Sequence, residues 1–310
     1  MKLRLLIMIL LLWQQTLVHS ANDDGASDLG VDYAFLTLMT LSPDFAAAFY
    51  TITNEGGLDV DINIYRLPYH IDLTADARSS LKLELAAAYQ TTQEVIPIFP
   101  TVPGEYVDST WETYGFGIGL LYDRRLSRQW HFLPSVRLGV AHMENKADYS
   151  GLLTNAVSDE FEGTLFNWNS TNAILNLGLG LKYNWTFLDR SSSITATAYH
   201  VIVDSFNESN EAIKFTEKAN LLSVKADLIQ PTEVYIAEHR MDMVLTFGVN
   251  HFFGDNRRTL DYTTSYEAGI GTEFPLKYVN TTYGHIRIIG NVLWSENMKG
   301  WMISLGYNPQ

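Results

Sequence analysis

The stretch TNAILNLGLGLKYNW, residues 171–185, alternates between large apolar residues and small or polar ones. The apolar set is Ala173, Leu175, Leu177, Leu179, Leu181, Tyr183 and Trp185. The other set is Asn172, Asn176, Gly178, Gly180, Lys182 and Asn184, and only Ile174 breaks the pattern. A period of two belongs to a strand, because successive side chains point to opposite faces. Most strands run about 5–6 residues, so a strand roughly twice as long requires surroundings that are apolar over a tall band.

The same alternation recurs along the whole chain. The clearest further strands are predicted at 81–89, 114–122, 135–141, 266–274, 285–294 and 301–307. Weaker candidates lie at 44–53, 58–68, 191–204, 217–228 and 242–253. The total is about twelve strands, while segment 229–241 reads either as a turn or as the start of a longer ninth strand. Since no convincing helix separates any two strands, an antiparallel meander is favoured over a parallel sheet.

The lengths of the predicted connections distinguish a membrane barrel from a soluble β-sandwich. The long connections are 91–110, 144–170 and 205–216, and the short ones between them are 123–129 and 187–190. A transmembrane barrel alternates long loops on one side with short turns on the other, whereas a sandwich has similar connections at both ends. We therefore predict an all-β fold, a transmembrane antiparallel up-and-down β-barrel of about 12 strands that covers residues 44–310.

Aromatic residues near the predicted strand ends support the same fold. Trp and Tyr favour the boundary between lipid and water, because each carries one polar group on a large apolar ring. The predicted lipid-interface aromatic residues are Trp111, Tyr183, Trp185, Trp294, Trp301 and Tyr307. An exported soluble β protein remains the alternative fold.

The N-terminus has the organisation of a secretory signal peptide. Lys2 and Arg4 precede an apolar stretch, and Val18 and Ser20 occupy the small-residue positions before a cleavage site. We assign residues 1–20 to the signal peptide and 21–43 to an acidic linker that is also a candidate lumen plug. The chain has 21 basic and 35 acidic residues, a formal net charge of −14, which makes nucleic acid an unsuitable partner.

The face opposite the apolar one carries charges of both signs and is expected to line the lumen. The predicted lumen-facing charged residues are Lys82, Glu84, Arg137, Lys182, Lys225, Glu267, Glu273 and Arg287. Barrels of eight strands are filled by side chains and those of sixteen hold open water, so twelve strands lie between these cases. The charges predict either a network of ion pairs that fills the lumen or a narrow selective pore.

Catalytic and metal-binding patterns are weak. The chain has no cysteine, and no histidine is followed by serine two residues later, as a barrel phospholipase would require. His70 and Asp72 share a strand face, as an outer-membrane protease pair would, but one such spacing arises often by chance. The remaining histidines show no ligand spacing, and the alternate glycines of 115–119 make room inside a barrel rather than a phosphate loop. We expect no catalytic residue, no metal and no cofactor.

Three segments resemble autotransporter translocator barrels. SENMKGWMISLGYN, residues 295–308, resembles their closing strand, and YGFGIGLLYDRRL (114–126) and ILNLGLGLKYNW (174–185) resemble interior strands. The close approach of the signal peptide to the barrel resembles the solitary members, which lack a passenger domain. This resemblance implies twelve strands, location in the cell outer membrane of a Gram-negative bacterium, and no settled activity. The family's usual C-terminal aromatic residue has its counterpart in Tyr307, three residues before the end.

The expected function is a non-enzymatic component of the bacterial envelope or surface, without a passenger. It would act through acidic loop residues, chiefly Glu144, Asp148, Asp159, Glu160 and Glu162. The expected partners are outer-membrane lipid and the barrel assembly machinery, with a monomer favoured. The alternatives are a small porin-like channel through the charged lumen and an outer-membrane enzyme that hydrolyses lipids or peptides.

Overall fold

A computed structural model describes residues 45–53, 59–76, 78–187, 190–236, 239–253, 263–278 and 281–309. The predicted signal peptide 1–20 and the linker 21–43 lie outside these residues. The strands are β1 Phe45–Thr53, β2 Asp59–Ala75, β3 Ser79–Pro97, β4 Tyr106–Arg125, β5 Trp130–Ser150, β6 Asn169–Phe187, β7 Arg190–Glu208, β8 Thr216–Ile236, β9 His239–Phe253, β10 Thr264–Tyr278, β11 Thr281–Trp294 and β12 Met298–Pro309. The helices are α3 Leu152–Ala156, α4 Ser158–Phe161 and the 3₁₀ turn η1 Glu211–Ile213.

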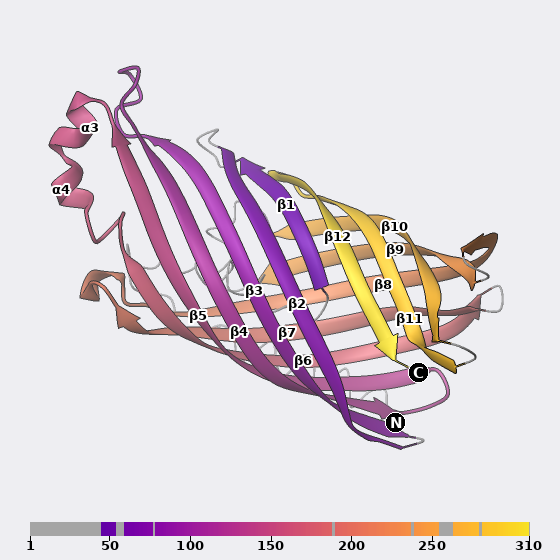
Figure 1. The fold of residues 1–310 in the computed structure, drawn as a ribbon. Helices are drawn as coiled ribbons and strands as arrows, with labels where there is room; N and C mark the ends of the chain where they lie inside the picture. The colour runs from indigo at the N-terminus through magenta and orange to yellow at the C-terminus, as the bar shows by residue number, and fades with distance from the viewer. Residues whose placement is uncertain are drawn as a thin grey trace.

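The strands form one closed antiparallel barrel. Each strand pairs with its neighbours in the sequence, and β1 closes the ring by pairing with β12. Figure 1 shows the tilted wall, with α3 and α4 standing beyond one end of β5. The loop end of the barrel carries segments 98–105, 151–168 and 209–215, and the turn end carries 126–129. The predicted fold class is therefore confirmed.

The strands are longer than the sequence predicted, and the loops are correspondingly shorter. The predicted loops 91–110, 144–170 and 205–216 shrink because β3, β4, β5 and β7 continue past the apolar band toward the loop end. Segment 229–241 is neither a simple turn nor only the start of the ninth strand. It holds the end of β8, a register shift between Pro231 and Tyr235, and the beginning of β9.

The two faces of β6 separate as the alternation requires. Leu177 and Leu179 are about 40% exposed, at 38% and 41%, whereas Asn172 and Asn176 are buried. Trp185 pairs with Ser192 beside the turn that joins β6 to β7. The apolar face therefore points out of the barrel, and the aromatic end of β6 lies at the turn end, as predicted from strand order.

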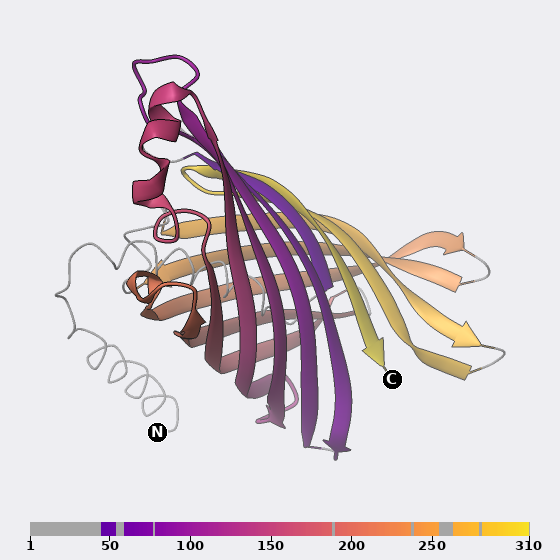
Figure 2. The ribbon, with the colours of Figure 1, turned by 60° about the vertical axis from the view of Figure 1, so that its left-hand side comes forward.

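In the described part of the chain, none of the helices has the length and apolar character needed to cross a bilayer. Figure 2 shows the two short helices at the loop end of the barrel, at the ends of β5 and β6.

The outward position of Leu177 gives a test of the fold. Leu177→Lys should lower the free energy of unfolding by about 2–4 kcal/mol, because it places a charge in the hydrocarbon near mid-strand. Leu177→Phe should change it by less than about 1.5 kcal/mol, because lipid accommodates the larger ring and an apolar exchange of this size is tolerated. Urea titration of protein folded into lipid vesicles measures both. A tolerated lysine together with a disruptive phenylalanine would show that Leu177 faces the lumen.

Candidate functional site

Seven of the eight predicted lumen charges make ion pairs in the structure. Lys82 Nζ lies 3.8 Å from Asp72 Oδ1, and Lys225 Nζ lies 3.7 Å from Glu267 Oε1. Arg287 contacts Glu273 at 2.6 Å and Asp227 at 2.9 Å. The eighth, Lys182, pairs in register with His131, whose ring nitrogen lies 2.7 Å from Asp123 Oδ1.

The most buried of these pairs reaches across a whole strand. Glu84 of β3 and Arg137 of β5 both lie opposite Gly119 of the intervening β4. Arg137 Nε donates to Glu84 Oε2 at 2.6 Å, and the two side chains are only 8% and 6% exposed. A Cβ on Gly119 would lie 2.5 Å from Arg137 Cγ. Arg137 can reach Glu84 because the residue beneath it has no side chain.

A second pair has the same arrangement. Gly248 of β9 lies in register between Lys225 of β8 and Glu267 of β10. A Cβ on Gly248 would lie 2.4 Å from Glu267 Cγ. The Glu267 side chain therefore crosses over this glycine to contact Lys225. The sequence contained both the charges and the glycines, but only the strand register shows that each of these glycines separates an acid from its base.

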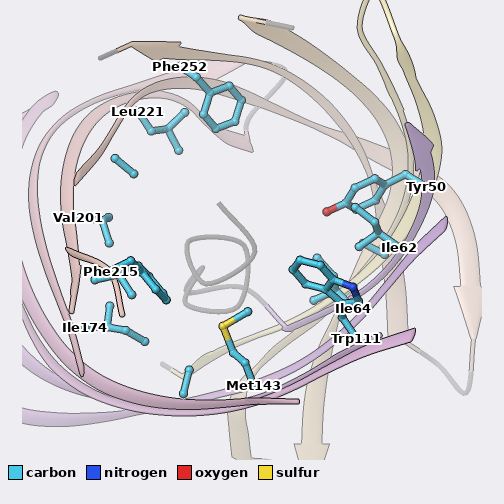
Figure 3. Close-up of a cluster of buried hydrophobic side chains, with 14 of the residues drawn as sticks. Tyr50, Ile62, Ile64, Trp111, Met143, Ile174, Val201, Phe215, Leu221 and Phe252 are labelled. Atoms are coloured by element: carbon cyan, nitrogen blue, oxygen red, sulfur yellow. The ribbon is translucent and has the colours of Figure 1, made fainter. Parts of the chain in front are cut away.

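The loop-end half of the lumen holds a large apolar cluster among buried polar residues such as Gln90, Thr113 and Asn172, so the interior is less uniformly polar than predicted. Figure 3 shows the apolar side chains that project inward from several strands. The larger members of this lumen cluster are Tyr50, Ile62, Ile64, Trp111, Met143, Trp168, Ile174, Val201, Val203, Phe215, Leu221, Phe252, Met298 and Met302. Ile174, the one residue that broke the alternation of 171–185, is 3% exposed within it. The break therefore marked the apolar part of the lumen.

The prediction that Trp111 faces the lipid interface is wrong. Its ring is 8% exposed and packs edge-on against Trp168, with ring centroids 5.5 Å apart. Its Nε1 donates to Ser109 Oγ at 2.8 Å. On β4 the exposed aromatic residues, Tyr114 among them, occupy even positions, so the odd number of Trp111 already placed it on the inner face.

A row of aromatic rings on the outer face was missed. It crosses β12, β1, β2, β3 and β4 and consists of Trp301, Phe49, Tyr65, Tyr89 and Tyr114, with successive ring centroids 4.4, 5.7, 6.3 and 4.9 Å apart. The Tyr89 hydroxyl donates to Glu112, which also accepts from Lys146 at 2.8 Å. Rings that end in hydroxyls bonded to charges suit the lipid–water boundary. The sequence concealed the row, because its members come from five separate strands.

The other predicted interface aromatics lie near the ends of their strands. The Tyr183 ring lies between Trp130 at 4.9 Å and Trp185 at 6.0 Å, near the turn end. Trp294 stacks on Tyr266 at 5.8 Å. The backbone of Tyr307 pairs with Ile286 of β11. Their placement in the interface stays a prediction.

At the loop end, segments 98–105 and 151–168 fold together into a unit that we call the platform. Glu105 is 8% exposed, and its Oε2 accepts the Thr154 backbone N–H of α3 at 2.7 Å. A Cβ on Gly151 would lie 2.3 Å from the Glu105 carboxylate, and Gly151 has a φ of +95° that favours glycine. The Thr154 N–H, with weaker help from its neighbours in α3, lowers the pKa of Glu105 although burial opposes this.

Asparagine side chains hold the rest of the platform. Asn167 adopts a φ of +54°, which asparagine tolerates. Its Oδ1 accepts the Ala147 N–H at 2.8 Å, and its Nδ2 donates to Glu162 at 3.0 Å. Asn145 accepts the Asn167 N–H at 3.0 Å and donates to Ser109 at 2.8 Å. The predicted acidic loop is therefore an ordered structure, and Glu162 is one of its internal contacts.

The weak catalytic and metal candidates do not combine into a site. His70 Nδ1 lies 3.7 Å from Glu84, and Asp72 contacts Lys82, so each member of the predicted His70–Asp72 pair engages another residue. Within the described ranges, no three His, Asp or Glu side chains are grouped closely enough to hold a metal ion.

The closed wall, the outward apolar face and the ion-paired lumen define a transmembrane β-barrel. The barrel is similar to the transport unit of AIDA-I from Escherichia coli, at 12% identity and a TM-score of 0.57 over 94% of this chain and 100% of that one. It is also similar to the translocator domain of NalP from Neisseria meningitidis, at 11% identity and a TM-score of 0.54 over 91% of this chain and 94% of that one. The β domain of the Bordetella autotransporter BrkA is similar at 10% identity and a TM-score of 0.55, over 86% of this chain and 96% of that one.

Residues 58–309 match the model of the solitary outer membrane autotransporter β-barrel domain, and the chain belongs to that family. It is therefore a bacterial outer-membrane protein, embedded in that membrane through the barrel. No curated protein matches the chain.

The buried pair Glu84–Arg137 predicts a non-additive pattern of stability. Arg137→Leu and Glu84→Leu should each cost about 3–5 kcal/mol, because each leaves a buried charge without its partner. The double variant should cost less than either. Asp72→Asn, in the more exposed pair with Lys82, should cost no more than about 1 kcal/mol. Additive losses in urea titrations would show that the two charges do not depend on each other.

The contact between Glu105 and α3 predicts a pH-dependent platform. Because folding lowers the pKa of Glu105 below its usual 4.5, its stabilising effect is complete above that value. The effect is lost as the pH falls through the lowered pKa. Glu105→Gln should make segment 151–168 more sensitive to protease at neutral pH. Acidification should then increase the protease sensitivity of this variant less than it does that of the parent protein. Glu160→Gln, an exposed change on α4, should leave both properties as in the parent protein.

Proposed function

We propose that this barrel is a non-enzymatic surface component of the outer membrane that carries no passenger and acts through its platform. The observation that carries the proposal is the buried contact between Glu105 and α3, which joins two separate loops into one unit. A preordered surface loses less conformational freedom on binding than a flexible loop does. The solitary character of the family supports the absence of a passenger.

The acidic residues of the platform provide its outer surface. Asp159 and Glu160 are exposed on α4, and Asp148 is exposed on the adjoining end of β5. Glu144 is engaged with Lys146 at 3.1 Å, and Glu162 is engaged with Asn167. We therefore assign the contact with a partner to Asp148, Asp159 and Glu160, and structural roles to Glu144 and Glu162.

The lumen supports this role because its side chains bind one another. Glu84 and Arg137 form a buried ion pair, and Arg287 contacts both Asp227 and Glu273. Charges that neutralise each other at short range attract passing ions less than free charges would. In this proposal the paired side chains of the lumen stabilise the barrel wall, and outer-membrane lipid surrounds the barrel. The barrel assembly machinery inserts the protein and recognises Tyr307 as its aromatic residue.

A small channel is the second candidate. It is favoured by the Lys82–Asp72 pair, whose side chains are 34% and 45% exposed on the lumen side. Such accessible charges would bias the passage of ions if the path were continuous.

Conductance in planar bilayers separates the two candidates. We expect the full-length purified protein to give no steady current, because paired and apolar side chains occupy the lumen. Uniform current steps whose ion preference changes in Lys82→Glu would instead support the channel. The chain has no cysteine, so Asp159→Cys provides a clean control of orientation. On intact cells an impermeant maleimide should label Asp159→Cys, whereas Asp76→Cys at the turn end should be labelled only after permeabilisation.

A further inference from the structure

Four arginines gather at the turn end of the barrel, and we call them the arginine cluster. Arg78 lies between β2 and β3, Arg124 and Arg125 end β4, and Arg128 lies in the turn to β5. Segments 76–78 and 124–129 hold these four arginines and one acid, Asp76, a net formal charge of +3. Segments 98–105 and 151–168 at the loop end hold four acids and no lysine or arginine. These two parts of the barrel therefore carry charge of opposite sign.

Backbone hydrogen bonds fix the position of the arginine cluster. Arg125 donates its N–H to the Arg78 carbonyl at 2.8 Å, and this bond joins the turn after β2 to the end of β4. On the other side, Asn184 of β6 donates its N–H to the Gln129 carbonyl at 2.8 Å. The turn that carries the arginines is therefore bonded to its neighbours on both sides.

Three guanidinium groups of the cluster are accessible to an anion. Arg78, Arg124 and Arg128 are exposed, and within the described ranges none of the three forms an ion pair. Asp76 directs its Oδ1 to the backbone N–H groups of Arg78 and Ser79, at 2.6 and 2.7 Å. Because this carboxylate closes its own turn, the three arginines remain available to a partner.

Aromatic rings lie beside the cluster on the outer face. Arg124 occupies the even, outward side of β4, as does Tyr122, which is 37% exposed. Arg124 pairs in register with Phe132, two residues beyond Trp130. The Trp130 ring is exposed and lies 4.9 Å from the Tyr183 ring. Rings that carry one polar group favour the level of the lipid headgroups, so we expect the Arg124 guanidinium near the headgroup phosphates.

The chemistry of arginine matches a phosphate group that carries net negative charge. A planar guanidinium donates two parallel hydrogen bonds to phosphate oxygens and does not lose its proton. Each basic residue close to a membrane surface strengthens the binding of anionic lipid by about fivefold. A zwitterionic headgroup places a positive charge next to its phosphate, and the cluster would repel that charge. The cluster therefore favours lipids whose headgroup is anionic.

We propose that the arginine cluster binds the headgroup of an anionic phospholipid in the leaflet that surrounds the turn end. Arg124 contacts the phosphate from the outer face of β4, and Arg78 and Arg128 approach it from the turns on either side. The acyl chains lie along the apolar outer face, next to residues such as Leu120, which is 40% exposed. The bound lipid fixes the depth of this end of the barrel in the bilayer, whatever the platform binds.

Lipid titrations followed by native mass spectrometry test the proposal. The purified protein in non-ionic detergent is titrated with dioleoylphosphatidylglycerol, which is anionic, or with dioleoylphosphatidylcholine, which has the same chains and a zwitterionic headgroup. We expect the parent protein to bind the first phosphatidylglycerol at least about 25-fold more tightly than phosphatidylcholine, about fivefold for each of two arginines. Arg124→Gln with Arg128→Gln should lose most of this preference and keep the parent affinity for phosphatidylcholine.

A matched single substitution separates the cluster from the general charge of the protein. Arg124→Gln alone should lower the preference for phosphatidylglycerol by about fivefold. Arg240 is also an exposed arginine at the turn end, but it lies at the beginning of β9 and donates to the Thr232 carbonyl at 2.8 Å. Arg240→Gln should therefore keep the parent preference. Equal losses in the two single variants, or an unchanged preference in the double variant, would overturn the proposal.

Peptidoglycan is a different kind of anionic partner, and the same variants distinguish it. If the parent protein binds both lipids equally and sediments with purified peptidoglycan while the double variant does not, the cluster binds a carboxylate polymer and the lipid proposal is wrong. Heat-modifiable migration in detergent verifies the folding of each variant. If the double variant fails to fold, Arg124→Gln and Arg128→Gln carry the test singly, each with an expected loss of about fivefold.

Discussion

The structure depends on the inability of hydrocarbon to hydrogen-bond to a peptide backbone. Every strand must pair along both edges, and this forces the sheet to close. Closure in turn gives each strand one face toward lipid and one toward a narrow lumen. The apolar and polar sets of 171–185 are the direct result, since Leu177 meets lipid and Asn176 meets the interior.

The narrow lumen creates a second constraint, which is crowding of the inner face. Neighbouring strands lie about 4.8 Å apart, so two charged side chains that stand on either side of a third strand can meet only across the residue between them. Gly119 and Gly248 relieve this crowding, because each allows a side chain of one neighbouring strand to lie across it toward the other. At these two positions the glycine and the charged pair form one packing arrangement.

The sequence predicted the elements that depend on the alternation of apolar and polar residues. Its predictions failed for strand length and for contacts between strands, which alternation alone does not determine. Twelve strands, their order and the outward leucines of β6 follow from the period of two. The loop lengths were wrong, because β4 and β5 continue above the apolar band with residues such as Ser109 and Lys146, whose polarity resembles that of a loop. Trp111 was predicted to face lipid because it lies near a strand end. Its odd number places it instead on the inner face of β4, opposite the exposed even-numbered residues. The row from Trp301 to Tyr114 requires the register between five strands, which no single segment contains.

The platform and the lumen are coupled through one pair of rings. Trp168, at the end of the platform, packs on Trp111, which belongs to the lumen cluster together with Met143 and Ile64. Asn145 bonds to Asn167 of the platform and to Ser109 beside Trp111. A force applied to the platform by a bound partner would therefore act on the apolar packing of the lumen. The charged pair of β3 and β5, Glu84 and Arg137, lies nearer the turn end of the same strands. The barrel thus combines a half held by charged pairs with a half whose apolar cluster contacts the platform through Trp111 and Trp168.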